Sequence, residues 1–543
     1  MKDIITFEID DFFTNAGIVG LTKILEQIDA KKEHYQIFEQ KLEVEKDFLL
    51  QTDLTHAFFK TMIHEYQEDN GFTSILKQIS LILEKMKQKD SRIEDVKDNL
   101  KWIKERLNAN SYQSAYQIII QTIPDDINFY DLVKSLTSIK EKQELEKVLN
   151  NIYTYLMVPE VNEIFYMKNL AYAVISHFWE NKSFLNRSNS KKDMARVHQK
   201  EVEEPFKKYL QREKDGEEYC AACGEAITAS EREKFTFLKD MEGDLIRKKS
   251  DYWNFVVDKW ICPKCMFLYT LIPLGFKKIG NHFIFVNNND SIYSLVSLNK
   301  KIEITNEIPY YAIFNMLLLK QTEENLKKLD NIEVISKYQE EPHYRFDIVS
   351  KEILLWIKRA NEPLEKLSRF PNIKIQEVYY NLYTEVLTCI LKNRDLYDLM
   401  INLLVLSVQK EFNHIVNYVG FIYKIQLIKS EIKLEKEVCM NTKNQHLLAA
   451  KSGKEIREVL IEGEKDDSSL IGISYKMFDA LKKGDSIEFI DIIGRLCNST
   501  KKMIPGFLID TLSDVRTFRK LGCAFVIGFR GGIMEMEGEE ENE

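Results

Sequence analysis

The sequence predicts an α+β protein that is mainly α-helical, with a helical N-terminal region, a small β-rich module containing four cysteines, and a C-terminal helical bundle. Three observations support this prediction. Only 20 glycines and 10 prolines occur in 543 residues, and so few turn-forming residues in a long chain favour helices. Apolar residues recur with the helical period on both sides of the middle of the chain. Between them, short apolar runs alternate with turn residues, which is typical of β-strands.

Residues 1–185 are predicted to form a helical N-terminal domain. Two apolar stripes with helical spacing face a core, one made of Ile18, Leu21, Leu25 and Ile28 and one made of Ile75, Ile79, Ile82, Leu83 and Met86. The first helix is expected to start at Thr14 or Asn15. Gly17 and Gly20 near this start predict close packing against another segment.

Residues 186–218 are rich in serine, asparagine and charged side chains, which predicts a charged linker or mobile loop. Residues 219–310 are predicted to follow as a small β-rich module. Its predicted strands are Phe255–Val257, Phe267–Ile272 and His282–Val286. Turns between them are expected at Gly275, at Gly280 and in the run from Asn287 to Asp290.

Residues 311–534 return to a helical pattern and are predicted to form the C-terminal helical region, with a bundle towards its end. Residues 447–462 and 474–496 are strong helix candidates there. Residues 535–543 form a tail with six glutamates, which is predicted to be solvated because like charges repel one another.

Four of the eight cysteines form two tight pairs, Cys220 with Cys223 and Cys262 with Cys265. Each C-x-x-C turn directs two sulfurs to one point, and two such turns can complete a tetrahedron of thiolates suited to zinc. Gly224 relaxes the backbone behind the first turn, and Pro263 stiffens the second. The separation of the pairs is about twice the roughly 15–20 residues of a short zinc ribbon, so the insert is expected to be structured.

Four cysteine ligands would close the coordination shell and leave no place for a reactive water, so the predicted zinc is structural. A redox-active C-x-x-C is the alternative, but it needs a thioredoxin-like βαβ context that the sequence does not indicate. The remaining cysteines are predicted to be core thiols: Cys389, Cys439, Cys497 and Cys523.

Catalytic motifs are not recognisable in this sequence. It contains no Gly-rich phosphate loop and no dinucleotide-binding fingerprint, and its nine histidines are dispersed, so the protein is predicted not to be an enzyme. The N-terminus carries acidic residues where a secretory signal has basic and apolar segments. Apolar runs stay well below the roughly 20 residues that span a bilayer. A cytoplasmic location without membrane contact is therefore expected.

The net charge of -9 argues against binding of nucleic acid by the whole surface. Two local basic patches nevertheless predict nucleic-acid contact. The first runs from Arg187 to Lys214 and includes Lys191, Lys192, Arg196, Lys200, Lys207 and Lys208, and the second is Arg247, Lys248 and Lys249. Four acids dilute the first patch, Asp193, Glu201, Glu203 and Glu204, so a solvated loop face is the alternative interpretation.

The opening segment Asp11–Leu21, DFFTNAGIVGL, resembles the start of the CXXC-CXXC family of CRISPR-associated proteins. Widely separated cysteine pairs give that family its name, and both pairs are present here. Phe283–Asn287 and Phe518–Gly528 are also similar to the family, so the resemblance touches most of the chain. The acidic tail is a departure from the family pattern.

Members of this family are large subunits of type I-B effector (Cascade) complexes, which act in antiviral defence. The resemblance implies a part in crRNA-guided DNA surveillance: recognising the motif that flanks the target, stabilising the opened DNA and recruiting the helicase–nuclease. It implies as partners crRNA, target DNA, the backbone and guide-capping subunits and a small subunit. It also adds Asn15, in the opening motif, to the candidate nucleic-acid contacts.

Two alternatives stay open. One is a stand-alone zinc-containing nucleic-acid-binding regulator, and the other is a metal-dependent nuclease whose carboxylates are dispersed along the chain. Neither alternative has a sequence motif of its own.

Overall fold

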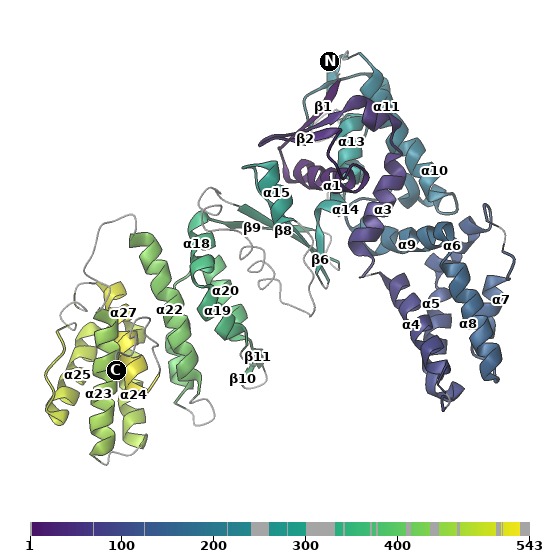
Figure 1. The fold of residues 1–543 in the computed structure, drawn as a ribbon. Coiled ribbons are helices and arrows are strands. Elements are labelled where there is room, and N and C mark those ends of the chain that lie inside the picture. The colour runs from purple at the N-terminus through teal and green to yellow at the C-terminus, as the bar shows by residue number, and fades with distance from the viewer. Residues whose placement is uncertain are drawn as a thin grey trace. The chain divides into compact units, whose positions relative to one another are not determined.

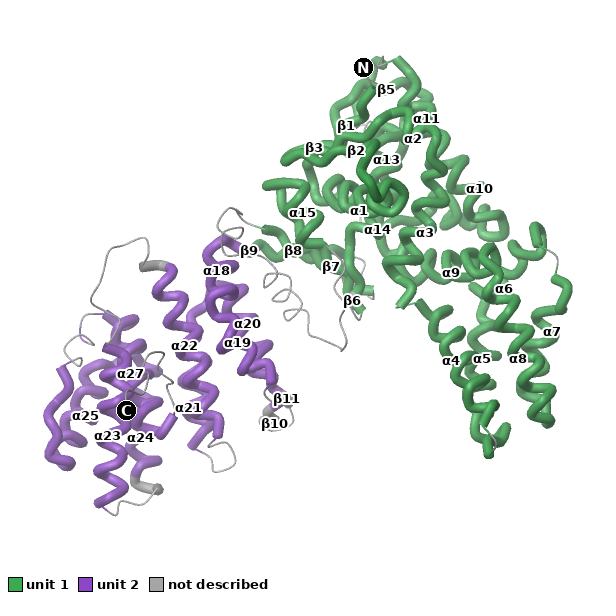
Figure 2. Tube along the Cα trace, in the orientation of Figure 1, with its two compact units in different colours: residues 1–307, 332–348 green, residues 308–331, 349–543 purple. Residues whose placement is uncertain are grey.

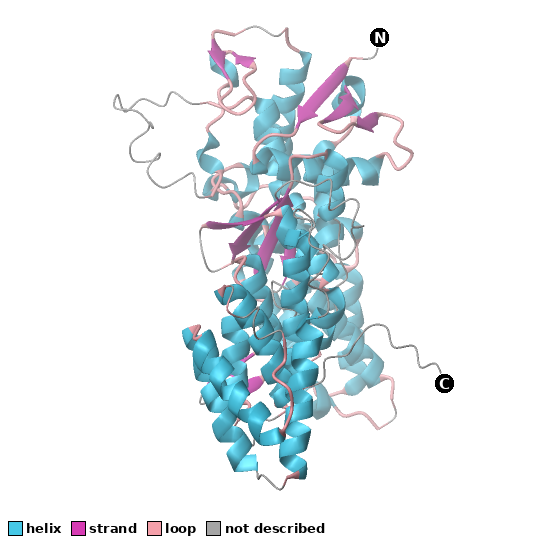
Figure 3. Ribbon diagram, turned by 90° about the vertical axis from the view of Figure 1, so that its left-hand side faces the viewer, coloured by secondary structure: helices cyan, strands magenta, loops and turns pink. Residues whose placement is uncertain are grey.

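The computed structural model describes residues 3–68, 70–88, 90–123, 125–213, 216–239, 260–279, 281–299, 332–339, 343–369, 372–375, 378–408, 414–434, 445–463, 467–506, 512 and 514–532. These residues are mainly helical with small antiparallel sheets (Figures 1 and 3), which confirms the predicted α+β class. The chain divides into two compact units (Figure 2). Unit 1 comprises residues 1–307 and 332–348, and unit 2 comprises residues 308–331 and 349–543.

Unit 1 contains a three-stranded antiparallel sheet in the order β1–β3–β2, formed by Ile4–Glu8, Lys41–Glu45 and Tyr35–Ile37. Phe7 pairs with Leu42 and Tyr35 pairs with Val44, and all four side chains are buried on one face. A second sheet has the order β6–β7–β8–β9, formed by Lys277–Ile279, His282–Asn287, Ile332–Tyr338 and Tyr344–Val349. Strand β7 confirms the strand predicted at His282–Val286.

Helix α1 (Phe12–Ile28) packs closely against α13 (Pro263–Thr270) and the following α14 (Ile272–Gly275). A Cβ atom built on Gly17 would lie 2.5 Å from the Leu268 carbonyl oxygen, and one on Gly20 would lie 2.4 Å from that of Leu271. Only glycine permits this approach, which confirms the close packing predicted for both residues. The helix begins earlier than predicted, because the Asp11 carboxylate accepts a hydrogen bond from the Thr14 amide and caps it.

Unit 1 has a second hydrophobic core, which is formed by the helices from α4 to α9. Its helices are α4 (Gly71–Met86), α5 (Lys97–Leu107), α6 (Asn110–Ile119), α7 (Phe129–Ser135), α8 (Lys142–Leu156) and α9 (Pro159–Ala173), with the 3-10 turn η1 (Ile93–Val96). The predicted stripe from Ile75 to Met86 is buried in α4. Two further helices, α2 (Lys46–Gln51) and α3 (Leu54–Tyr66), contribute to the first core.

The segment predicted as a linker or mobile loop is mostly helical in the described residues 186–213. It contains η4 (Arg187–Asn189), α10 (Met194–His198), the π-helical turn η5 (Gln199–Glu203) and α11 (Glu204–Gln211). The linker prediction is therefore wrong there. Two of the polar residues in this segment are helix caps: Asn186 accepts from the Ser188 amide, and Asp193 accepts from the amides of Ala195 and Arg196.

The cysteine-bearing segment shares the first core of unit 1, whereas the sequence predicted a small module of its own. Cys220, Cys262 and Cys265 belong to the same buried cluster as Ile18 and Phe58. Its described elements include β4 (Glu218–Tyr219), β5 (Ala226–Ile227), α13, α14, β6, β7 and α15 (Ile292–Leu298). The strand predicted at Phe267–Ile272 is wrong, since a short apolar run cannot distinguish a strand from a buried helix. The strand predicted at Phe255–Val257 lies outside the described residues.

Unit 2 is largely helical. Its helices are α18 (Lys351–Arg359), α19 (Asn361–Ser368), α20 (Leu382–Leu391), α21 (Tyr397–Leu406), α22 (Ile415–Leu434), α23 (Gln445–Glu462), α24 (Asp467–Lys483), α25 (Ser486–Thr500) and α27 (Val515–Phe529), with the hairpin β10 (Ile373–Ile375) and β11 (Val378–Tyr380). The helix predicted over 474–496 is divided, because Gly484 has a φ of 75° and Asp485 caps α25. The acidic tail 535–543 lies outside the described residues.

Helices α23 and α27 meet through glycines. A Cβ atom on Gly453 would lie 2.1 Å from the Phe525 carbonyl oxygen, and one on Gly528 would lie 1.9 Å from that of Ala450. The segment Phe518–Gly528, which carried part of the family resemblance, thus supplies one side of this contact. Among the described residues, every helix is too short or too polar to cross a membrane.

Candidate metal centre

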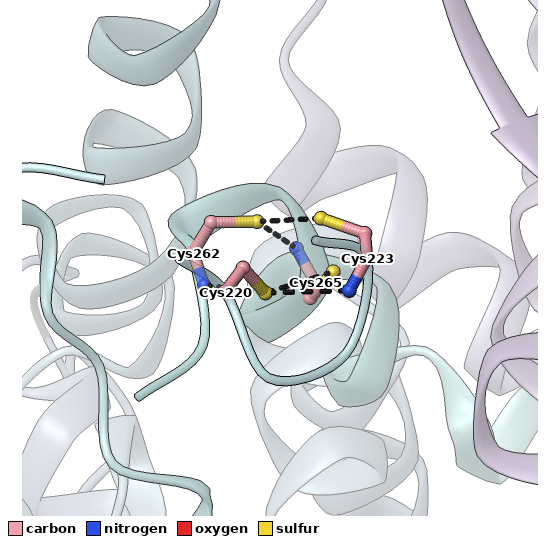
Figure 4. A group of neighbouring side chains, drawn as sticks. All are labelled: Cys220, Cys223, Cys262 and Cys265. Carbon is pink, nitrogen blue, oxygen red and sulfur yellow. Dashed lines mark hydrogen bonds between the residues drawn. The ribbon is translucent and has the colours of Figure 1, made fainter. Parts of the chain in front are cut away.

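The sulfur atoms of Cys220, Cys223, Cys262 and Cys265 all lie within 4.8 Å of one another (Figure 4). The Sγ atoms of Cys220 and Cys265 are 3.8 Å apart, and those of Cys223 and Cys262 are 3.6 Å apart. Thiolates bound tetrahedrally to one ion at about 2.3 Å would lie about 3.8 Å from one another. The two distant turns therefore come together as predicted, and the four cysteines could hold a metal ion.

The first turn, from Cys220 to Gly224, connects strands β4 and β5. The Gly224 amide donates to the Cys220 carbonyl, and the Cys220 amide donates to the Glu225 carbonyl at 2.8 Å. Gly224 has a φ of 71°, which is the left-handed conformation that glycine adopts without steric cost. The Cys223 amide donates a hydrogen bond to the Cys220 sulfur at 3.5 Å. The turn thus points both sulfurs to one side and directs an amide at one of them.

The second turn begins helix α13. Cys262 is the N-cap residue, and its sulfur accepts from the Cys265 amide at 3.3 Å. Pro263 occupies the first helical position, where its missing N–H leaves no helical hydrogen bond unmade. Cys265 is one turn further along the helix. Helix capping and metal-ligand spacing therefore use the same four residues.

Backbone contacts join the two turns. The Ala221 amide donates to the Trp260 carbonyl at 2.8 Å, and Cys220 and Trp260 form a parallel bridge. The Cys262 amide donates to the Cys220 sulfur at 3.2 Å. The contacts with Trp260 join the two turns through main-chain atoms alone, and the Cys262 amide adds a bond that depends on the Cys220 sulfur. The insert between the turns is described only in part, since residues 240–259 lie outside the described ranges.

The cluster lies at the edge of the core. Cys220, Cys262 and Cys265 are buried, whereas Cys223 is exposed. Hydrogen bonding from the Cys223 thiol lowers the pKa of Cys220, and bonding to Cys220 raises the pKa of Cys265 above the ordinary thiol value. Without a cation, four crowded thiols thus resist ionising together. A divalent ion would remove that conflict, because it would stabilise all four thiolates.

Lys264 supplies a positive charge beside the cluster. It forms an ion pair with Glu225, and the Tyr209 hydroxyl donates to the same carboxylate at 2.7 Å. Burial opposes the charge on Lys264, but Glu225 and the neighbouring cysteines outweigh burial and raise its pKa. This second layer of contacts ties α11, which carries Tyr209, to both cysteine turns.

Asn15 is fully buried, which corrects the expectation that it contacts nucleic acid. Its Nδ2 atom donates to the Asn287 Oδ1 at 2.8 Å and the Asn289 Oδ1 at 2.7 Å. Its Oδ1 accepts from the Asp10 amide at 3.0 Å. The residue therefore fastens the start of α1 to the turn after β7. Polarity alone could not reveal this role, because the partners lie more than 270 positions away in sequence.

The predicted basic contacts fall into three groups. Lys191, Lys192, Arg196 and Lys208 are exposed. Lys207 is half-buried and neutralised, since its ammonium lies 2.7 Å from the Glu203 carboxylate and donates to the Thr52 carbonyl. Arg247, Lys248 and Lys249 lie outside the described residues.

Glu203 and His198 form a buried polar pair that the sequence did not suggest. The Glu203 carboxylate accepts from the amides of Leu54 and Thr55 at the start of α3, and His198 Nδ1 lies 2.9 Å from the Thr55 hydroxyl. Burial raises the pKa of Glu203, but Lys207 and Thr55 outweigh it and lower the value. A negative charge at this helix N-terminus is favourable. The two residues position α10 and η5 against α3.

His198 makes the stability of unit 1 depend on pH. Burial lowers its pKa from 6.5 to about 4, and Glu203 opposes the shift only in part. Between pH 6.5 and 4 the unfolded chain therefore binds a proton that the folded chain does not, so stability falls as the pH falls. The phenyl ring of His198→Phe can stack on Phe58 and Phe184 as the imidazole does. We expect this variant to lose about 3 kcal/mol less unfolding free energy than the wild type between pH 7 and 4, because it has no imidazole to protonate.

Chemical unfolding of the two proteins at several pH values tests this expectation. His177, whose pKa burial also lowers to about 4, remains in both and supplies the same background slope. Parallel stability curves for the wild type and His198→Phe would contradict the assignment.

Within the described ranges, the four cysteines are the one group of three or more His, Cys, Asp or Glu side chains whose ligand atoms could share a metal ion. In this part of the chain, no group of carboxylates comes together that would support the nuclease alternative. The chain matches no protein-family model, no curated protein and no solved structure. The function proposed for the chain therefore rests on its own residues, their geometry and the family resemblance of its motifs.

Proposed function

We propose that Cys220, Cys223, Cys262 and Cys265 bind one structural Zn²⁺. Soft thiolates in a tetrahedron favour zinc or iron over magnesium and calcium, and zinc is the usual ion of four-cysteine structural sites. Four protein ligands leave no position for substrate or water, so the ion would connect β4, β5 and α13 without taking part in a reaction. Lys264 and the amides of Cys223, Cys262 and Cys265 would compensate part of the charge of the four thiolates.

The proposed role of the chain is that of the large subunit of a type I-B crRNA-guided DNA surveillance complex. One observation carries this proposal: the two features that resemble the family, the opening Asn-Ala-Gly segment and the paired cysteines, form a single packed unit. Gly17 and Gly20 of the opening segment lie against Leu268 and Leu271, directly after the second cysteine pair. If the opening segment and the cysteine site depend on each other sterically, the members of one family are expected to have both.

In this role the guide RNA reads the target by base pairing, and the protein contacts the flanking motif and the backbone. The chain would help to recognise that motif, stabilise the opened DNA and recruit the helicase–nuclease. Its largely helical unit 2 is consistent with the small-subunit-like bundle that the family resemblance implies. The backbone and guide-capping subunits would provide most contacts to the crRNA, which suits a chain with a net charge of -9.

Affinity purification of the tagged full chain from its native cells tests both parts of the proposal. We expect about one zinc per chain by elemental analysis, together with short repeat-derived RNA and several co-purifying subunits. Iron in place of zinc would contradict the metal assignment alone. The absence of both RNA and partner subunits would contradict the large-subunit role.

The stand-alone regulator remains the second candidate, because exposed basic residues suit it equally well. It predicts a stable isolated monomer that binds nucleic acid without a guide. Partner subunits and RNA that co-purify with the wild type and with Cys389→Ser, but not with Cys262→Ser, would favour the complex, since a stand-alone regulator binds RNA without partner subunits.

A further inference from the structure

Helices α10, η5 and α11 form one continuous helical segment over residues 194–211 (Figure 1). Together with the preceding residues it exposes six cations, which we call the cationic strip: Arg187, Lys191, Lys192, Arg196, Lys200 and Lys208. Within residues 187–211, all of which the structure describes, Glu204 is the one exposed acid. The local surface is thus strongly positive on a chain that is negative as a whole.

The tertiary structure creates this charge separation by using the other acids internally. Asp193 caps α10. Glu201 accepts from the Ser183 amide and from Asn189 Nδ2, both at 2.8 Å. Glu203 caps α3 and pairs with Lys207. Three of the four acids that dilute the basic patch in the sequence are therefore engaged by contacts within the fold, and Glu204 is the one that stays exposed.

The strip has a regular spacing. Arg196, Lys200, Glu204 and Lys208 follow one another at intervals of four residues, so they share one side of the helical segment. Arg196 and Lys200 are thus about one helical turn apart, and Lys200 and Lys208 are about two turns apart, with the π-helical turn η5 between α10 and α11. One strand of a duplex carries a negative charge about every 3.4 Å, so this row of cations could follow several phosphates.

The strip is held rigidly at both ends. The Lys168 ammonium donates to the Ser190 carbonyl at 2.9 Å, and the Ser114 hydroxyl donates to the same oxygen. At the other end, the Phe206 ring stacks on Phe267 of α13 at 4.2 Å between centroids. Tyr209 bonds to Glu225, which also pairs with Lys264 in the second cysteine turn. A rigid surface loses little entropy on binding, and this one is connected to the metal centre.

We infer that the cationic strip is a docking surface for the phosphodiester backbone of double-stranded nucleic acid, bound without base reading. Nucleobase stacking on single strands needs exposed aromatic rings, and protein interfaces need buried apolar anchors. No large apolar or aromatic side chain is exposed within residues 187–211. Charge without such anchors favours a duplex backbone as the partner. The inference deepens the proposed function and rests on the nucleic-acid role assigned there.

Binding of a labelled random-sequence DNA duplex to the purified full chain, measured by fluorescence anisotropy at several salt concentrations, tests the inference. We expect the triple variant Arg196→Gln, Lys200→Gln, Lys208→Gln to bind at least tenfold more weakly. The slope of log affinity against log salt should also become shallower by roughly 2 to 3, because each lost phosphate contact removes about 0.9. Glu204→Gln should tighten binding, since it removes the exposed acid of the row.

The matched control is Lys87→Gln, Lys101→Gln, Lys147→Gln, which removes the same charge from exposed positions on the second core of unit 1. This control should leave affinity and slope unchanged. Equal losses in both triple variants, or no loss in the strip variant, would overturn the inference. Tighter binding of a single strand than of the duplex, or loss of a co-purifying protein without loss of duplex binding, would overturn it as well.

The experiment separates this inference from the proposed function. If the strip variant assembles with guide RNA but keeps full affinity for the duplex, only the inference about the cationic strip is refuted. A wild type that lacks guide RNA but needs the strip to bind duplex refutes the large-subunit role and leaves the strip in place.

Discussion

Replacing Cys262 with serine is expected to abolish metal binding and to lower the unfolding temperature of unit 1 by on the order of 10 °C. Cys262 is fully buried, its sulfur lies 3.6 Å from that of Cys223, and it caps the helix that packs against α1. Serine can still cap α13, but its hydroxyl is a poor substitute for a thiolate ligand. The loss thus reports the metal, because its binding energy contributes to folding energy. Elemental analysis and calorimetry provide the measurements.

Two controls accompany this experiment. Cys389→Ser alters a half-buried thiol in unit 2 and should leave the metal content unchanged. Chelation of the wild-type protein should reproduce the destabilisation, and added zinc should reverse it. A Cys262→Ser protein with the metal content and melting curve of the wild type would show that the cluster holds no ion.

Gly17→Ala is expected to destabilise unit 1 by about 2 kcal/mol, which is typical of overpacking. The new Cβ atom would lie 2.5 Å from the Leu268 carbonyl oxygen and 2.6 Å from the Leu268 Cγ. A side-chain rotation cannot relieve a contact with a backbone oxygen, so α1 and α13 have to move apart. Alanine favours helix formation by up to about 1 kcal/mol, which offsets only part of this cost. Because α13 carries Cys262 and Cys265, faster metal release to a chelator should accompany the lower melting temperature.

Gly71→Ala is the matched control in the same unit. A Cβ atom there would lie 3.5 Å from the Asn169 Nδ2, an ordinary contact distance. We expect this variant to be at least as stable as the wild type, because alanine favours the helix, and to release metal at the wild-type rate. If Gly17→Ala behaves like Gly71→Ala, the steric dependence of the cysteine centre on the opening helix is wrong.

The sequence predicted the features that depend on local spacing. Each C-x-x-C turn directs its two sulfurs to one point, so the cluster could be predicted from the four cysteines and Gly224. The stripe from Ile75 to Met86 is likewise a local pattern, and it became the buried face of α4. Cys497 and Cys523 are buried as predicted, because isolated cysteines among apolar residues behave as small hydrophobic side chains.

Predictions failed where a local pattern had two physical solutions. The apolar run Phe267–Ile272 suits a strand and a buried helix equally, and the cap at Cys262 with Pro263 decided for the helix. The polar segment 186–213 suits a loop and a capped helix equally. It became helical because distant partners were available. Glu203 accepts a hydrogen bond from the backbone of α3, and Lys168 of α9 donates to the Ser190 carbonyl.

By itself, the sequence determined the helical class of the protein, the cluster of four cysteines that could hold a metal ion, and the close approach at Gly17 and Gly20. Only the tertiary structure decided that Asn15 is buried, that the cysteine turns belong to the core of α1, and that three of the four acids beside the basic patch are engaged by contacts within the fold. The reason is physical. Sulfur geometry and helical period act over a few residues, whereas burial and charge pairing depend on which distant segments meet when the chain folds.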